Sequence, residues 1–64
     1  MAIYRSSTRQ HRERLIQLIY DHQEISFYAI VYDLNGKRLH TTDKYMLEEL
    51  ANNKAIRWIH ENDI

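Results

Sequence analysis

The spacing of apolar residues near the N-terminus predicts a helix. Residues at helical spacing along this part of the chain are Leu15, Ile16, Leu18, Ile19 and His22. The preceding residues Ser7 to Gln10 fit a capping box, in which the serine and glutamine side chains satisfy free amides at a helix start. We therefore expect a helix over residues 8–22, preceded by a very short strand at Ala2–Arg5.

The middle of the chain is typical of a β-hairpin. Residues Ile25 to Asp33 are rich in β-branched and aromatic types and predict a strand. Residues Asp33 to Gly36 suit a type I turn, because glycine at the fourth position adopts a positive φ without strain. Such a glycine commonly forms a bulge and leads into a return strand, here Lys37–Thr41. A two-residue Asn35-Gly36 turn is the alternative, and it shifts the pairing by one residue.

The choice of turn decides which side chains share a face. In the bulged register Val31 faces Leu39, and one face collects the apolar residues Ile25, Phe27, Ala29, Val31 and Leu39. The opposite face then carries Tyr28, Ile30, Tyr32, Arg38 and His40. In the two-residue register Leu39 joins the tyrosines and His40 lies opposite Val31. The bulged register is favoured, because it separates apolar from amphipathic residues more cleanly.

The last third of the chain predicts a second helix and a final strand. Thr42 or Asp43 can cap the helix. Its buried stripe is expected at Met46, Leu47, Leu50 and Ala51. Asn52-Asn53 suits its end, since asparagine tolerates the left-handed conformation found at helix stops. Residues Lys54–His60 then read as a strand. A competing interpretation makes them the second helix of a helix-turn-helix pair, but little room is left for the turn.

Taken together, the elements predict a single small α+β domain over residues 1–64. The order is (β)αββαβ, with an antiparallel sheet and two helices on one face, as in the ferredoxin-like arrangement or a truncated version of it. A chain of 64 residues buries only about 60% of its unfolded surface, so its stability is marginal without help. Cysteine is absent, which excludes disulfides and thiolate zinc sites. Oligomerisation is the remaining common source of stability, and we expect a homodimer.

Charge is distributed unevenly, although nine basic and nine acidic residues cancel. The first 14 residues hold Arg5, Arg9, Arg12 and Arg14 against Glu13 alone, a net charge of +3, so the remainder carries −3. Arginines in the first turns of a helix oppose its dipole by a few tenths to about 1 kcal/mol each. A solvated helix end explains them equally well as a binding segment. The functional interpretation predicts a partner with an acidic surface.

The tyrosine-bearing sheet face is the second candidate binding surface. If both helices pack on the other face, this one is uncovered, and Trp58 can join it from the final strand. Tyrosine and tryptophan suit protein interfaces, where the ring is buried and its polar end stays wet. Aromatic side chains on an open sheet can also stack unpaired bases. Overall neutrality lowers the case for nucleic acid, because phosphate contacts dominate such affinities.

Catalytic and metal chemistry find little support in the sequence. No pair among the four histidines forms a local ligand motif, so we expect neither a metal site nor a cofactor. The serines and threonines are better explained as caps than as nucleophiles. A ribonuclease-like enzyme built from His40, Arg38 and Tyr32 is the third hypothesis, because histidine can move protons and arginine can hold a phosphate. Nothing in their spacing is specific to that chemistry.

The leading hypothesis is therefore a small cytoplasmic regulatory module without catalytic activity that binds another protein. The longest apolar run, Tyr28 to Tyr32, is far shorter than the roughly 20 residues of a membrane span, and no leader pattern is seen. Short compact chains of this kind are typical of regulators from bacteria, phages or mobile elements. A nucleic-acid-binding module that uses the tyrosine face and the arginines together is the alternative.

Overall fold

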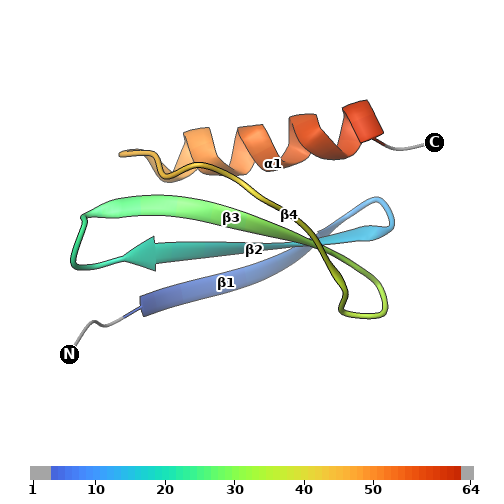
Figure 1. Ribbon diagram of the computed structural model, residues 1–64, viewed down its shortest axis with the longest axis horizontal. Helices are drawn as coiled ribbons and strands as arrows, with labels where there is room; N and C mark the ends of the chain where they lie inside the picture. Colours follow the sequence, from blue (N-terminus) through green and yellow to red (C-terminus); the bar gives the residue numbers. More distant parts are fainter. Residues whose placement is uncertain (1–3, 63–64) are drawn as a thin grey trace.

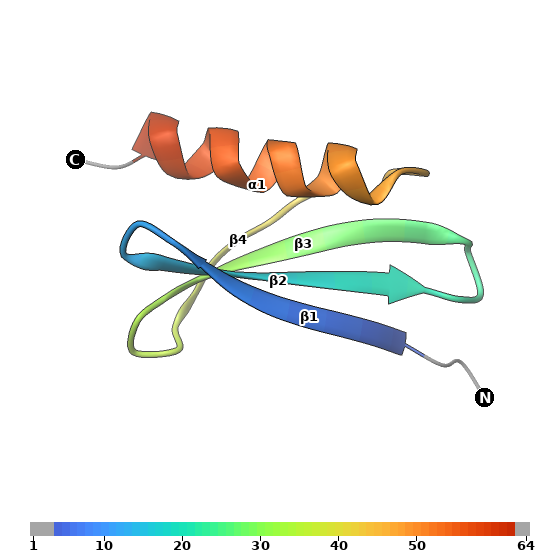
Figure 2. The same cartoon turned by 180° about the vertical axis from the view of Figure 1, so that it is seen from behind.

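The computed structural model describes residues 4–62, which form four strands and one helix. These elements are β1 (Tyr4–His11), β2 (Arg14–Asp21), β3 (Ser26–Asp33), β4 (Arg38–Thr41) and α1 (Glu48–Asn62). The strands pair antiparallel in chain order, and α1 crosses one face of the sheet, as two opposite views show (Figure 1 and Figure 2). The α+β class and the antiparallel sheet are confirmed. The ferredoxin-like (β)αββαβ order is wrong, because the described chain has one helix, after all four strands.

The predicted helix over residues 8–22 is instead a hairpin of β1 and β2. Ile16 and Leu18 are buried on the side that α1 covers, whereas Leu15 and Ile19 lie on the opposite side of β2. Because both faces of β2 carry apolar residues, the sequence loses its two-residue alternation and mimics helical spacing. The proposed capping residues Ser7 to Gln10 lie inside β1. Of the short strand expected at Ala2–Arg5, Ala2 and Ile3 lie outside the described residues, and β1 continues well past Arg5.

A two-residue turn joins β1 to β2. His11 pairs with Arg14, and Arg12 adopts a positive φ of 57° between them. A positive φ at the first turn residue matches the twist of antiparallel strands in tight hairpins. The side-chain amide of Gln10 donates a hydrogen bond of 2.9 Å to the carbonyl of Arg12. The polar segment that resembled the start of a helix is therefore a hairpin loop with its flanks.

The turn between β3 and β4 has the bulged form that the sequence predicts. The Gly36 amide donates to the Asp33 carbonyl at 3.1 Å, and Gly36 has a φ of 88°. The Asp33 amide donates to the Lys37 carbonyl at 2.9 Å, which places the first pair after the bulge. One carboxylate oxygen of Asp33 accepts the Asn35 and Lys37 amides, each at 2.9 Å. Asp33 therefore fixes the turn with both its backbone and its side chain.

A second irregularity then shifts the register of β4. Tyr32 pairs with Arg38, as the bulged turn requires, but Val31 pairs with His40. The predicted pairing of Val31 with Leu39 is therefore wrong, because Leu39 is an extra residue between these two pairs. A bulge of this kind turns the following side chains to the other face. It places His40 on the side of α1, away from Tyr28 and Tyr32.

The segment after β4 continues along β3. The Ala29 carbonyl accepts the Thr42 amide at 2.8 Å, and the Ala29 amide donates to the Thr42 hydroxyl at 2.9 Å. Further along, Phe27 and Tyr45 exchange backbone hydrogen bonds of 2.6 and 2.7 Å. The expected capping role of Thr42 or Asp43 is therefore wrong, because Thr42 completes the sheet and α1 begins only at Glu48.

The helix α1 runs without interruption through residues where a stop was predicted. Asn52-Asn53 lie inside it, and Lys54–His60 are helical rather than a strand. The competing helix-turn-helix interpretation correctly made Lys54–His60 helical, but these residues continue α1 and do not form a second helix. The buried stripe is Ala51, Ala55 and Ile59. Of the expected stripe only Ala51 is buried, whereas Met46, Leu47 and Leu50 are 82%, 60% and 43% exposed.

The hydrophobic core lies between α1 and the two central strands. It consists of Ile16, Leu18, Ala29, Val31, Ala51, Ala55 and Ile59. Alanines at the helix positions let α1 approach the sheet closely, so small side chains define its buried stripe. The expected core positions Phe27, Ala29 and Val31 are confirmed on this side, but Ile25 is 66% exposed. In the described part of the chain, no helix has the length and apolar character needed to cross a membrane.

Candidate functional site

The face of the sheet opposite α1 carries an unusual concentration of apolar and aromatic residues. Side chains alternate between faces along a strand, so the neighbours of the buried core positions point away from α1. On the two central strands and β4 we define the open sheet face by Leu15, Gln17, Ile19, Tyr28, Ile30, Tyr32 and Arg38. Of the predicted site residues, Tyr28, Ile30, Tyr32 and Arg38 thus share one face. Leu15, Gln17 and Ile19 were missed, because they lay in the predicted helix.

The side chains of the open sheet face are held in place by their neighbours. Ile30 is only 8% exposed although α1 lies on the other side of the sheet, because the side chains around it shield it. Tyr28 and Tyr32 are half-buried. The Tyr32 hydroxyl donates a hydrogen bond of 3.1 Å to the Gln17 side chain of β2. This contact fixes the ring against the sheet and gives a preorganised, mostly apolar surface.

His40 and Trp58 do not belong to this surface. Their rings are stacked on the α1 side, with centroids 4.9 Å apart and an interplanar angle of 4°. His40 is there because of the bulge near Leu39, and Trp58 is there because its segment is helical. The predicted aromatic face therefore loses two members, and with them the geometry of a ribonuclease-like arrangement of His40 with Tyr32.

The arginines of the first hairpin are also separate from the tyrosines. Arg9 pairs with Ile16 and Arg14 pairs with Asp33, so both stand at positions on the α1 side. Arg12 occupies the turn. The backbone of Arg5 pairs with Tyr20, while its side chain lies outside the described part of the structure. The conflict with a helix dipole disappears, because these residues lie in a hairpin rather than a helix. Arg9 and Arg14 are on the face opposite the tyrosines, whereas Arg38 shares the tyrosine face.

Two histidines that are distant in sequence meet at the end of the molecule. His11 of β1 and His60 of α1 have stacked rings with centroids 5.1 Å apart, and their Nε2 atoms are 2.9 Å apart. No local sequence pattern could reveal this pair, because 49 positions separate the two residues. Within residues 4–62, no group of three or more histidine, cysteine, aspartate or glutamate side chains is placed to hold a metal ion.

A charged network ties the β2–β3 loop to the segment before α1. One carboxylate oxygen of Asp21 accepts the Gln23 and Glu24 amides at 3.0 and 3.3 Å, and the other lies 3.4 Å from Lys44 Nζ. Lys44 also bonds the Glu24 carboxylate. Burial raises the pKa of Asp21, but the two amides and Lys44 together lower it below its ordinary value. The hydrogen bond with Glu24, against some desolvation, raises the pKa of Lys44.

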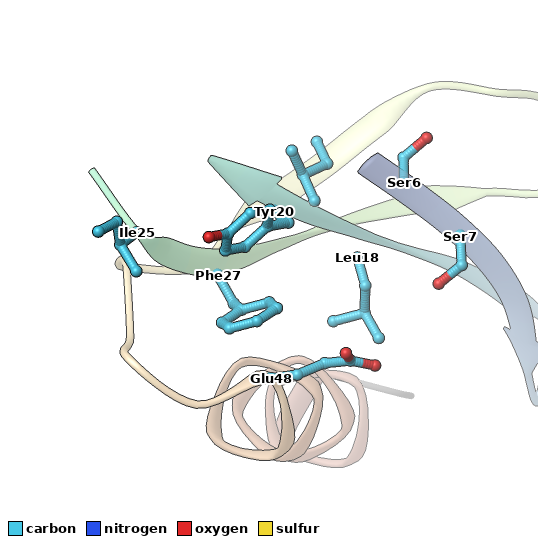
Figure 3. Close-up of a pocket in the computed structure, with 8 residues that line it drawn as sticks. Ser6, Ser7, Leu18, Tyr20, Ile25, Phe27 and Glu48 are labelled. Carbon is cyan, nitrogen blue, oxygen red and sulfur yellow. The ribbon is translucent and has the colours of Figure 1, made fainter. Parts of the chain in front are cut away.

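Two grooves flank α1. The larger, of about 550 Å³, lies toward β1 and is lined by Ser6, Ser7, Leu18, Ile19, Tyr20, Ile25, Phe27 and Glu48 (Figure 3). The smaller, of about 340 Å³, lies beside the stacked His40 and Trp58. Its walls carry both signs of charge, with Lys54 and Arg57 against Asp43 and Glu61. Arg57 is paired with Glu61 at 3.1 Å, so this groove has little net charge to attract a ligand.

Comparisons with protein-family models, curated proteins and solved structures found no match to this chain.

Proposed function

We propose that this protein is a small regulatory module without catalytic activity that binds another protein through the open sheet face. The observation that supports this proposal is the composition of that face on the two central strands. Five of its six positions, Leu15, Ile19, Tyr28, Ile30 and Tyr32, are apolar or aromatic. An antiparallel sheet with one solvated face ordinarily alternates apolar and polar residues. The absence of that alternation in β2 favours burial of this face against a partner.

The chemistry of the face indicates the kind of partner. Tyrosine rings contribute buried area while their hydroxyl groups remain at the wet rim of an interface. Arg38 stands opposite Tyr32 at the β4 edge and is exposed. Carboxylates pair well with the planar guanidinium group of arginine. The partner we propose is thus a protein whose contact surface is apolar at its centre and acidic beside Arg38.

Nucleic-acid binding is the second candidate, because Tyr28 and Tyr32 share an open four-stranded sheet with Arg38. Stacking of bases on such a surface is a known mode of single-strand recognition. However, Arg9 and Arg14 lie at positions on the other side of the sheet, and the net charge is zero. Few cations therefore remain near the tyrosines to contact phosphates, so protein binding is favoured.

The experiment is affinity capture from the native host, followed by binding measurements with the purified captured protein. Tyr32→Ala removes a large aromatic side chain of the face, and Met46→Ala removes a large apolar side chain that is 82% exposed elsewhere. We expect Tyr32→Ala to weaken binding by about tenfold or more, and Met46→Ala by less than about twofold. Equal effects of the two substitutions would contradict the proposed face. Loss of capture after nuclease treatment would favour the second candidate.

A further inference from the structure

The helix layer covers only part of its side of the sheet. α1 packs on β3 and, to a lesser extent, on β2. Beyond them, Ser7 and Arg9 of β1 are exposed, although their register partners Leu18 and Ile16 are buried. The edge strand β1 therefore projects past the helix, and a ledge remains beside α1.

Between Ser7 and the contact of His11 with His60, the ledge has the width of a second helix. Neighbouring strands lie roughly 4.8 Å apart. Two strand spacings from β3 to β1 thus correspond to about 10 Å, which matches the roughly 8–10 Å between the axes of packed helices. A helix laid over β1 would contact the flank of α1 and the sheet at once, as in a two-helix layer.

The floor of the ledge is largely apolar near the start of α1. Here the β1 groove, which we define by the eight residues lining the larger groove, has a volume of about 550 Å³. Leu18 and Phe27 point from the sheet toward the helix layer, and Glu48 reaches from α1 below Leu18 (Figure 3). The small side chain of Ser7 leaves the β1 side of the groove open. An apolar side chain from above β1 can therefore reach the partly buried Phe27 and the edge of Leu18, which is itself 4% exposed.

Ile25 at the end of the β1 groove is held in a costly conformation. Its φ is 49°, which is an outlier for a β-branched residue, and its side chain is 66% exposed. A strained, exposed apolar residue contributes little to the stability of the isolated fold. Such outliers tend to lie at binding sites, where a ligand uses the side chain that the strain presents.

Charges of opposite sign mark the two ends of the ledge. Glu48 lines it near the start of α1, whereas Arg9 is exposed on β1 two residues beyond Ser7, toward the hairpin turn. A helix lying on the ledge would meet a carboxylate at one end and a guanidinium at the other. Complementary charges at both ends would fix its direction.

We propose that the β1 groove binds an amphipathic helix of another protein and so completes a two-helix layer in trans. The apolar side chains of that helix lie on Leu18 and Phe27, its basic residues lie beside Glu48, and its acidic residues lie beside Arg9. A second copy of this chain is a poor occupant, because the apolar stripe of α1 is already buried on its own sheet. Ser7, Leu18 and Phe27 of this groove lie on the α1 side of the sheet, whereas Ile19, which also lines it, belongs to the open sheet face, so the two surfaces adjoin at the end of β2.

The first test measures binding of synthetic helical peptides by fluorescence anisotropy. The probe is an 18-residue peptide with leucines at every third or fourth position, lysines at one end and glutamates at the other. We expect a dissociation constant below about 1 mM and a gain of helical circular dichroism on binding. Absence of binding up to that concentration overturns the proposal. Binding without a gain of helix also overturns it, and would instead indicate strand addition to β1.

The location is tested by two neighbouring exposed residues of β1 that point to opposite sides. Ser7→Trp fills the groove, and Thr8→Trp places the same side chain on the open sheet face. We expect Ser7→Trp to weaken peptide binding at least about tenfold and Thr8→Trp to change it less than about twofold. The reverse result would overturn the β1 groove as the site while leaving the proposed open sheet face intact.

Orientation and strain give two further checks. Arg9→Glu should weaken binding of the peptide and strengthen binding of a peptide with its terminal charges exchanged. Arg38→Glu on the open sheet face should change neither affinity. Ile25→Gly should raise the melting temperature by about 4–8 °C, because it relieves the positive φ, and should weaken the peptide. Unchanged peptide affinity in both Arg9→Glu and Ile25→Gly overturns the proposed mode of binding.

Discussion

The ring of His40 lies parallel to that of Trp58, at an interplanar angle of 4° and a centroid distance of 4.9 Å. β4 has only four residues, so this stack is a major link between the edge of the sheet and α1. The link exists because the bulge near Leu39 turns His40 toward the helix. His40 and Trp58, which the sequence suggested for a binding surface, thus connect β4 to α1.

Substitution of Trp58 tests this structural role. Trp58→Ala should lower the free energy of unfolding by about 3 kcal/mol, because it removes a large half-buried ring and its stacking contact with His40. Trp58→Phe, which keeps a ring against His40, should cost about half as much. Urea denaturation followed by circular dichroism is the suitable measurement, since Trp58 is the one tryptophan of the chain. A loss below about 0.5 kcal/mol for Trp58→Ala would contradict the role.

The position of the buried stripe on α1 is tested by comparing two aliphatic residues. Ile59 is 1% exposed, whereas Leu50 is 43% exposed. Ile59→Ala should cost about 2–5 kcal/mol of stability, and Leu50→Ala less than about 1 kcal/mol. The sequence pattern placed Leu50 in a buried stripe, so a loss at Leu50 equal to or larger than that at Ile59 would contradict the helix position described here.

Substitutions of Asn53 test whether α1 is continuous through this residue, because alanine and glycine should change stability in opposite directions. Asn53 is exposed within the helix. Asn53→Ala should therefore stabilise the protein by about 0.5 kcal/mol, and Asn53→Gly should destabilise it by a few tenths, following helix propensity. If Asn53 were a left-handed helix stop, glycine would be tolerated and alanine would be harmful. Thermal unfolding of the two variants separates these cases.

The charged network around Asp21 predicts a pH dependence. The pKa of Asp21 is lower in the folded protein than its ordinary value of 3.8, so its contribution is complete above that pH. The contribution is lost as the pH falls through the lowered folded-state pKa. Wild type should therefore exceed Asp21→Asn in stability by a constant amount between about pH 5 and 8, and the difference should shrink below about pH 4. A stability difference that grows on acidification would contradict a lowered folded-state pKa of Asp21.

Self-association through the open sheet face is tested by the dependence of stability on concentration. If the expected homodimer forms, the melting temperature rises with protein concentration. Tyr28→Asp, which places a charge on the open sheet face, should abolish the rise, and Leu34→Asp in the exposed β3–β4 turn should not. A stable monomer at high micromolar concentration in sedimentation would remove the homodimer and leave the face to the proposed acidic partner.

The second half of the sheet was accessible to sequence reasoning, because turn chemistry is local. Asp33 and Gly36 determine the bulged turn within four residues, and both act there as their types predict. The first hairpin was not accessible, because Leu15 and Ile16 face opposite sides of β2 and both are apolar. The apolar residues on the second face of β2 support the proposed binding surface. The same residues removed the two-residue alternation by which a strand is recognised in a sequence.

The candidate sites were predictable only in part for a related reason. Tyr28, Tyr32 and Arg38 could be assigned to one face from strand periodicity and the turn. The bulge that moves His40 away from them has no evident sequence signal. The burial of Ala51 and Ala55 depends on the close approach of α1 to β3, and tertiary packing of this kind overrides the stronger local signal of Leu47 and Leu50.

The order of the strands also has a kinetic consequence. Each strand pairs with its neighbour in the chain, so every strand pairing closes a short loop at low entropic cost. Contacts across long stretches of sequence, such as that of His11 with His60, arise when α1 docks. The meander can therefore assemble rapidly, and the slow step is the capture of a helix that has little apolar surface of its own. Until α1 docks, the side of the sheet that it will cover is exposed, and any other amphipathic helix within reach can compete with α1 for it.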